Sequence, residues 1–270
     1  MIVDYAWSKP GGAALVAAGV TGVMRYLSHD SSKTLQRSEA DDLASHGIAM
    51  GVVFEDMANR AGDGYQAGMN DAVVAGYMLT GQRSGYTDLA MPAGRPIYFA
   101  CDYDANWVEV APYFAGAAHQ IGQDRVGIYA GLKIIEAAAN AGYKWLWQTG
   151  AWSGGQWSPK AVLRQEIQSR TIGGVDCDVN DHQAEDWGQW TPGGEIVTPQ
   201  DKQDIAKLVL DGIPAVMEGV QVRDALANAN LWWLDHALGG TTTPSMSDAQ
   251  KALITDIHNL ITQLNATPKP

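Results

Sequence analysis

Cysteine and basic residues are scarce in this sequence. The two cysteines, Cys101 and Cys177, stand in no CxxC or Cys/His spacing, so we expect neither a disulfide framework nor a thiolate metal site. Lysine and arginine number 18 against 30 aspartates and glutamates, which gives a formal net charge of −12. Because binding to nucleic acid requires clustered cations, we expect no nucleic-acid partner. A neutral substrate, or one with positive patches, fits this charge better.

Long apolar segments are also missing. No window of about 18 consecutive apolar residues occurs, so we expect no membrane insertion. The N-terminal stretch MIVDYAWSKPGG has neither a basic region nor a sustained apolar region. Both are required of a secretory leader, so we expect no signal peptide.

Several catalytic and cofactor motifs are absent from the sequence. No GxGxxG follows the first predicted strand and no GxxxxGK[ST] occurs, which disfavours the open-sheet nucleotide binders. There is no HExxH, no Ser-His-Asp spacing and no Cys-His nucleophile signature. We therefore expect no cofactor and no metal, and metal-dependent hydrolysis and acyl-enzyme chemistry become weak hypotheses.

What the sequence does contain is an alternation of short β-prone runs with helical segments. Eight strand candidates cover residues 2–7, 22–27, 50–55, 96–102, 125–130, 144–148, 163–168 and 175–179. Between them lie helical segments such as 12–18, 34–45, 65–79, 108–121 and 132–141. Eight repeated units predict an α/β fold, a (β/α)8 TIM-like barrel. The barrel would occupy about 190 residues against a typical 250, so we expect it to be compact or distorted.

The pattern changes after the predicted barrel. We assign residues 1–190 to the barrel, 191–200 to a linker, 201–240 to a helical region, 241–247 to a flexible link and 248–270 to a C-terminal amphipathic helix and tail. In the last segment Ile254, Ile257, Ile261 and Leu264 follow coiled-coil spacing. This stripe is suited to a homo-oligomer, to docking on virion subunits, or to packing back on the barrel.

Acidic residues gather at the C-terminal ends of the predicted strands, where parallel barrels carry their chemistry. The first strand supplies Asp4, the third Glu55, the fourth Asp102 and Asp104, and the eighth Asp178. A lone aspartate at a strand end is most often a helix cap or a turn former. Acids that converge on one pocket raise one another's pKa, however, and this favours a functional role for these residues.

Strand alternation predicts that Asp102 and Asp104, two residues apart, point to the same face. A pair of carboxylates across a pocket is typical of glycoside hydrolysis, in which one protonates the leaving oxygen. Arg25, at the end of the second strand, is placed to neutralise them or to bind substrate.

Flat aromatic side chains and one amide accompany the acids. Sugar sites use such apolar faces, and the candidates at or just beyond strand ends are Trp7, Tyr129, Trp147, Gln148 and Trp152. The alternative for a strand tryptophan is a packing role in the outer layer.

The segments IVDYAW, GVMRYLS, GVVFED, PIYFACDYDA, VGIYAG, WLWQTGAW and GGVDCDVND occur in order around the predicted barrel. In this they resemble the glycoside-hydrolase-like barrel domain of actinobacterial secreted proteins and of the lysins of their phages. That domain is similar to the muramidases of glycoside hydrolase family twenty-five. The resemblance covers residues 1 to about 190.

The resemblance implies a peptidoglycan-directed hydrolase in which Asp4, Asp102 and Asp104 line the catalytic pocket and Asp178 closes it. The muramidases have Asp-x-Glu on the fourth strand, with the glutamate as general acid. Here the second acid is Asp104, which is one methylene shorter. Either Glu55 supplies the missing reach, or the domain binds glycan without cutting it.

We therefore predict a lysozyme-like muramidase of a phage or actinobacterial lytic system, acting on the glycan strands of peptidoglycan. The alternative is a phage tail or virion-associated protein whose barrel binds cell-wall glycan without cleaving it. Its expected location is the host cytoplasm before lysis, or the virion.

Overall fold

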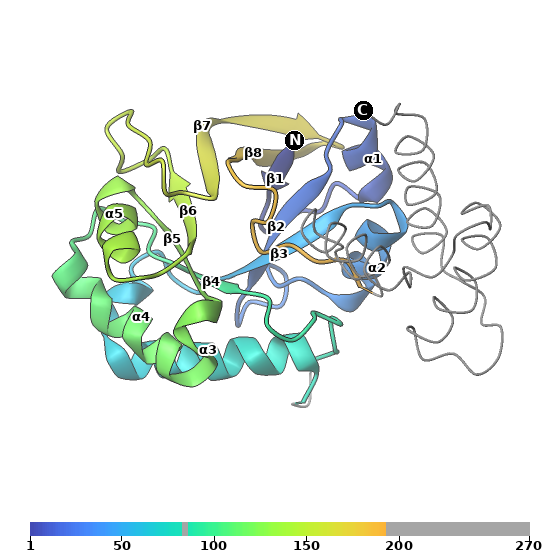
Figure 1. Cartoon of the computed structure of the whole chain (residues 1–270). Coiled ribbons are helices and arrows are strands. Elements are labelled where there is room, and N and C mark those ends of the chain that lie inside the picture. Colours follow the sequence, from blue (N-terminus) through green and yellow to red (C-terminus); the bar gives the residue numbers. More distant parts are fainter. Residues whose placement is uncertain (83–85, 193–270) are drawn as a thin grey trace, which may run out of the picture. The chain divides into compact units, whose positions relative to one another are not determined.

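The computed structural model describes residues 1–82 and 86–192. Eight strands form a closed barrel in sequence order, from β1 to β8 (Figure 1). They are β1 (Ile2–Asp4), β2 (Gly22–Leu27), β3 (Ala49–Phe54), β4 (Ile97–Ala100), β5 (Val126–Ala130), β6 (Trp145–Thr149), β7 (Leu163–Ile172) and β8 (Val175–His182). The predicted barrel is confirmed. The linker from residue 193 onward and the segments 201–240, 241–247 and 248–270 lie outside the described residues.

The eighth strand runs against the other seven. Strands β1 to β7 run parallel to one another, whereas β8 is antiparallel to both β7 and β1. Only Gly173 and Gly174 separate β7 from β8, and both have positive φ, 57° and 81°. A two-residue turn of this kind makes a hairpin, whereas a parallel return needs a dozen or more residues. The barrel is therefore mixed, a departure from the all-parallel form that the sequence reasoning did not foresee when it expected a compact or distorted barrel.

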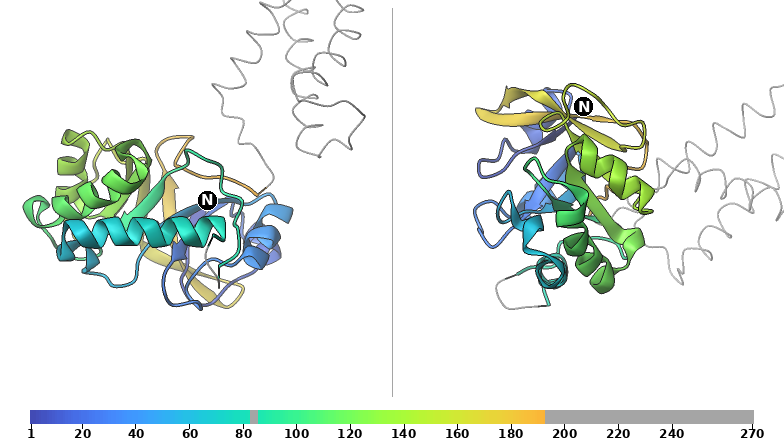
Figure 2. Two further views of the ribbon diagram at one scale, coloured as in Figure 1. Left: turned by 90° about the horizontal axis from the view of Figure 1, so that it is seen from below. Right: turned by 90° about the vertical axis from the view of Figure 1, so that its left-hand side faces the viewer.

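Five helices connect the first six strands on the outside of the barrel, within the described residues. They are α1 (Gly12–Ala17), α2 (Arg37–Ser45), α3 (Tyr65–Thr80), α4 (Trp107–Ile121) and α5 (Leu132–Asn140), close to the predicted segments. Short 3₁₀ turns, η1 (Arg60–Asp63) and η2 (Gln123–Arg125), precede α3 and β5. Figures 1 and 2 show α3, α4 and α5 on one side of the barrel and α1 and α2 on the other. No helix follows β6, because residues 150–162 form a loop.

Close backbone contact joins the two longest helices. A Cβ atom at Gly68 of α3 would lie 1.9 Å from the carbonyl oxygen of Tyr113, and one at Gly116 of α4 would lie 2.0 Å from that of Tyr65. The two glycines are therefore required by the approach of the helices.

The core has two layers, one inside the barrel and one between the strands and the helices. The inner layer consists of Ile2, Met24, Val53, Tyr98, Ala100, Tyr129, Trp147, Leu163 and Trp187. Trp187 closes the end of the barrel at which β2 and β3 begin, since a Cβ at Gly22 would lie 2.7 Å from its ring. The opposite end, where β1 to β7 finish, carries the polar side chains.

In the described part of the chain, no helix is long and apolar enough to cross a membrane. Nor do three or more His, Cys, Asp or Glu side chains of these residues form a group that could hold a metal ion.

Candidate functional site

The mouth of the barrel, at the C-terminal ends of β1 to β7, is lined by inward-facing polar side chains. On β1 and β2 the inward positions are Asp4 and Tyr26, and on β7 the inward position is Gln165. Because β8 is antiparallel, its contribution comes from the middle of the strand. Asp178 is the register partner of Asp4, and Asn180 that of Ile2.

Asp4 is the buried acid at the centre of this site. Its side chain is almost fully enclosed, with 1% of the residue exposed. Burial raises the pKa of Asp4 to about 7, against hydrogen bonds from Asn180 and Gln165 that lower it. The charge of Asp178 raises it further, and a hydrogen bond from Tyr26 lowers it. Asp4 therefore changes its charge near neutral pH.

Two amides hold Asp4 in place. Asn180 Nδ2 donates to Asp4 Oδ2 at 2.7 Å, and Gln165 Nε2 donates to the same oxygen at 2.9 Å. The amide oxygens are held in turn, because Trp147 Nε1 donates to Asn180 Oδ1 at 2.7 Å and the Tyr129 hydroxyl donates to Gln165 Oε1 at 2.6 Å. Four strands, β5 to β8, thus fix the orientation of one carboxyl group on β1.

Asp178 and Asp102 are the acids nearer to solvent. Partial burial raises the pKa of Asp178, and the negative charges of Asp102 and then Asp176 raise it further. Asp102 follows β4 and is partly exposed. The indole Nε1 of Trp152 lies 3.5 Å from Asp102 Oδ1, a long contact. Asp102 and Asp178 are therefore close enough at the open end of the barrel for the charge of Asp102 to raise the pKa of Asp178.

Glu55 lies beside a buried lysine. Lys33 Nζ donates to Glu55 Oε1 at 2.7 Å, and the Lys33 side chain is only 8% exposed. The same ammonium lies 4.3 Å from the ring centroid of Tyr26 and 5.6 Å from that of Trp7. The carboxylate of Glu55 is thus at the mouth, as predicted from its strand, but it is engaged in an ion pair.

Asp104 is an exposed residue in an ion pair. Its side chain is 58% exposed and lies 3.3 Å from Lys133 Nζ of α5. Because β4 ends at Ala100 and the chain bends at 103–104, the strand alternation from which a shared face was predicted does not extend to Asp104. Strand alternation carries the inward direction from Ala100 as far as Asp102 and no farther.

Arg25 also lies away from the acids that it was expected to neutralise. It is fully buried between the barrel wall and α2, where Arg25 Nε donates to Glu39 at 2.6 Å. It also donates to the carbonyl oxygens of Tyr5 and Lys33. The inward position of β2 belongs to its neighbour Tyr26, since adjacent strand residues face opposite sides.

Three predicted substrate-binding residues are buried inside the fold. Trp147 is 1% exposed and Tyr129 is 7% exposed, and both belong to the inner core layer. They act on the site through the two amides and offer no open face to a sugar. Gln148 is fully buried and holds the loop 150–158, donating to Ser153 and to the carbonyl oxygen of Gln156.

Two predicted aromatic residues are exposed at the mouth. Trp7 is 63% exposed, with its Nε1 donating to Asp30, and Trp152 is 48% exposed. Trp152 has φ of 56°, a conformation that costs about 1–3 kcal/mol for a bulky residue and is characteristic of functional sites. A Cβ on Gly131 would lie 2.6 Å from the Trp152 Cβ, so the loop is packed tightly against that backbone.

The loop that carries Trp152 also borders a small cavity. Its volume is about 200 Å³, and it is lined by residues of the loop 150–157 and by residues 166–168 of β7. Ile167 in this lining is 79% exposed. The β7 register shifts between Gln165 and Ser169, which turns these side chains away from the regular ladder.

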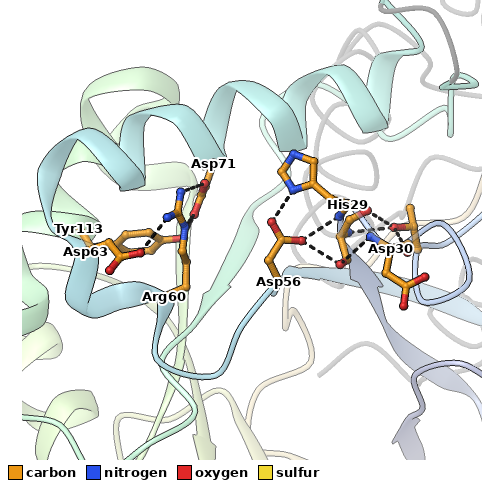
Figure 3. Close-up of polar contacts among 9 residues, drawn as sticks. His29, Asp30, Asp56, Arg60, Asp63, Asp71 and Tyr113 are labelled. Carbon is orange, nitrogen blue, oxygen red and sulfur yellow. Dashed lines mark hydrogen bonds and ion pairs between the residues drawn. The ribbon is translucent and has the colours of Figure 1, made fainter.

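Two further networks fix the loops after β2 and β3 (Figure 3). Asp56 accepts hydrogen bonds from the backbone and ring of His29 and from Ser28 at 2.8 Å. These bonds, against the effect of burial, hold the pKa of Asp56 below its usual value. Asp71 of α3 accepts two bonds from Arg60 at 2.8 Å and one from Tyr113 at 2.9 Å.

The predicted site residues do not include four side chains that shape the site: Tyr26, Lys33, Gln165 and Asn180. The alternation of β2 carried a signal for Tyr26, because Met24 and Tyr26 share the inward face. Lys33 lies in the loop between β2 and α2, where no periodic pattern indicates direction. The roles of Gln165 and Asn180 depend on contacts across the barrel.

An eight-stranded mixed barrel with acids at its mouth defines a glycoside-hydrolase-like domain. The family model described as Rv2525c-like, glycoside hydrolase-like domain matches residues 13–184. The chain belongs to this family, and the resemblance found in the sequence is confirmed.

One similar protein, known by sequence and by crystal structure, is mycobacterial. The Mycobacterium tuberculosis protein named "Putative peptidoglycan hydrolase Rv2525c" is 31% identical over an alignment of 207 residues, and the match covers 70% of this chain and 83% of that protein. The crystal structure of the Tat-secreted protein Rv2525c with L-tartrate matches with a TM-score of 0.64 and 29% identity. Its complex with HEPES gives 0.63 and 28%. Both comparisons cover 70% of this chain and 98% of the crystallised one.

Proposed function

We propose that this chain is a lysozyme-like muramidase that cleaves glycosidic bonds in the glycan strands of peptidoglycan. The observation that carries the proposal is the pair of carboxyl groups at the barrel mouth, Asp178, whose pKa is raised by burial and by the charge of Asp102, and Asp102 itself. Glycoside hydrolysis needs one carboxyl group that keeps its proton near neutral pH and a second that is charged. The family membership and the name of the mycobacterial relative support the same reaction class.

We assign the proton donor to Asp178 and the charged partner to Asp102. The pKa of Asp178 is raised by burial and by Asp102, which is the condition that a general acid requires. Asp4 is too enclosed to meet a leaving oxygen directly, so it acts by its charge and by fixing the site. The exposed indoles of Trp7 and Trp152 supply apolar faces for sugar rings.

Cleavage is tested by measuring new reducing ends on purified peptidoglycan. Asp102→Asn and Asp178→Asn should each lower turnover by at least about two orders of magnitude, the usual contribution of a general acid or base. Asp104→Asn is the matched control, because its carboxylate is on the surface with Lys133. Near-normal turnover in both mouth variants, with folding verified by circular dichroism, would reject these roles. Loss of turnover in Glu55→Gln alone would move the acid to Glu55.

A second candidate is a barrel that binds cell-wall glycan without cleaving it, as a virion-associated protein. It is favoured by the position of Asp104 on the surface and by the ion pair that occupies Glu55. Wild-type protein that sediments with peptidoglycan but releases no reducing ends would support this candidate. In that case Trp152→Ala should reduce sedimentation.

The biological setting that we propose is a phage or actinobacterial lytic system, with the protein in the host cytoplasm before lysis or on the virion. Fractionation of infected cells and of purified particles tests the location. The last segment is proposed to form a homo-oligomer or to bind virion subunits. Light scattering of the full chain with Ile257→Asp and Ile261→Asp tests self-association, since both changes place charge in the predicted apolar stripe.

A further inference from the structure

The two oxygens of the Asp4 carboxyl group have unequal surroundings. Oδ2 accepts two N–H bonds, from Asn180 at 2.7 Å and from Gln165 at 2.9 Å. Oδ1 is contacted by the hydroxyl of Tyr26 at 3.3 Å, which is long for an O–H···O bond. A proton added to Oδ2 would point at two N–H groups, whereas a proton on Oδ1 meets a hydroxyl oxygen that accepts it.

The orientation of the two amides follows from the groups that they face, the Trp147 indole for Asn180 and the Asp4 carboxylate for Gln165. The Trp147 indole can only donate, so the Asn180 atom that faces it at 2.7 Å is the oxygen and the NH₂ group faces Asp4. Gln165 Oε1 receives the hydroxyls of Tyr129 at 2.6 Å and of Thr149 at 3.1 Å. Turning Asn180 would bring its NH₂ group against the indole N–H of Trp147. Turning Gln165 would bring its amide oxygen against the ionised carboxylate of Asp4. Either arrangement costs free energy at a buried site.

We propose that Asn180 and Gln165 are positioning residues that confine the proton of Asp4 to Oδ1, so that Asp4 and Tyr26 share one hydrogen bond whose direction depends on protonation. While Asp4 is ionised, the Tyr26 hydroxyl donates to Oδ1. When Asp4 takes one proton from solvent, Oδ1–H donates to the Tyr26 oxygen instead. The Tyr26 hydroxyl proton then turns away from Asp4 and becomes a donor to an oxygen of a ligand in the mouth.

The ligand in this scheme is a sugar hydroxyl or carbonyl oxygen, and that part rests on the proposed function; the placement of the proton does not. Tyr26 is partly exposed, which allows its hydroxyl to reach a ligand. The other charged or titratable groups that act on the pair from the surrounding elements are Lys33 in the β2–α2 loop, Glu55 after β3, Asp102 after β4, Tyr129 of β5, and Cys177 and Asp178 of β8.

The test is the pKa of Asp4 measured by carbon-13 NMR of the carboxyl group, with Asp4→Asn used to assign the signal. Each hydrogen bond to the charged form lowers an acid's pKa. Asn180→Ala and Gln165→Met should therefore raise the Asp4 pKa by about one unit or more. Tyr26→Phe should raise it by less, because its bond is longer.

Two matched variants control for the loss of a buried polar group. Gln148→Met removes a buried amide bonded only to the loop 150–158, and Tyr98→Phe removes a buried hydroxyl bonded to the Trp187 carbonyl oxygen at 2.8 Å. Neither should move the Asp4 signal. The proposal is overturned by an unchanged Asp4 pKa in Asn180→Ala and Gln165→Met, or by equal shifts in the controls.

Asp4→Asn itself provides a second test, by NMR contacts, that does not require the variants Asn180→Ala and Gln165→Met to fold. Its side-chain amide imitates the neutral carboxyl group, with NH₂ in place of the protonated oxygen. We expect nuclear Overhauser effects from this NH₂ group to the ring of Tyr26. Nuclear Overhauser effects from it to the side chains of Asn180 and Gln165, without those to Tyr26, would contradict the proposal. If the wild-type protein shows no turnover, the proposed function is rejected, but the Asp4 pKa and the nuclear Overhauser effects still test the placement of the proton.

Discussion

Replacing Asp4 by asparagine should remove much of the pH dependence of this protein's stability. The pKa of Asp4 is about 7 in the folded protein, against an ordinary value of 3.8. Between these two values the folded protein holds a proton that the unfolded chain has already lost. The free energy of unfolding therefore falls as pH rises through this window and becomes level above about pH 7.

The magnitude follows from the difference between the two pKa values. One pKa unit is worth about 1.4 kcal/mol, so ionising Asp4 in its buried position costs about 4 kcal/mol. This is a large part of a typical stability of about 5–15 kcal/mol. Asparagine avoids the cost, because its carbonyl oxygen accepts from Asn180 and Gln165 and its NH₂ group faces Tyr26.

Urea unfolding at about pH 4 and about pH 8 measures the effect. From the lower to the higher pH, the free energy of unfolding of the variant should rise by about 4 kcal/mol relative to that of the wild type, since only the wild type bears the buried charge at the higher pH. Asp178 has a raised pKa of its own and changes both proteins in the same direction, so most of its contribution cancels in their difference, which reports Asp4 and its interaction with Asp178. This account would be refuted if the difference in the free energy of unfolding between variant and wild type did not depend on pH, or if the wild type became more stable relative to the variant as pH rises. Asp104→Asn, at an exposed ion pair, should differ little from wild type at either pH.

Three further substitutions have distinct expected results. Trp152→Ala should weaken peptidoglycan binding about tenfold in sedimentation assays, because it removes a half-exposed aromatic face, and its melting temperature should stay close to wild type. Arg25→Met should lower the free energy of unfolding by about 3 kcal/mol in urea, because it removes both close bonds to the largely buried Glu39 carboxylate and leaves only Lys9 Nζ at 3.7 Å; a loss below about 1 kcal/mol would contradict this. Gly68→Ala should be at least as damaging, since its Cβ would meet the Tyr113 carbonyl oxygen at 1.9 Å, and unchanged thermal unfolding would show that the helices separate easily.

The sequence predicted most of the barrel because its strands and helices have strong local signals. The buried run before Asp102 and the glycine-bounded helices were recognised from residues close together in the chain. The direction of β8 was not, because an alternating strand has the same pattern in either direction. The Gly173-Gly174 pair was the local sign of a hairpin.

Site residues were predicted less evenly, for a physical reason that Asp104 and Arg25 illustrate. Asp104 lies beyond the end of β4, where direction depends on how the chain turns, whereas Arg25 lies within β2 on the outward face, one residue before the inward Tyr26. The structure places Asp104 on the surface and Arg25 in the outer layer, beside Lys133 and Glu39 respectively. Neither difficulty arises for Asp4, because it lies within β1 on the inward face.

The reversed direction of β8 gives the site a feature that an all-parallel barrel would not have. In a parallel barrel each strand offers its last residues to the mouth, and a loop carries the chain away. Here β8 enters from the hairpin and passes Asp178 before reaching Asn180, which lies deeper beside Trp147. One strand thus supplies both an acid with a raised pKa near solvent and an amide donor to the buried Asp4. Because both side chains are fixed by the same backbone, a change in the β7–β8 turn should alter the positions of Asp178 and Asn180 together.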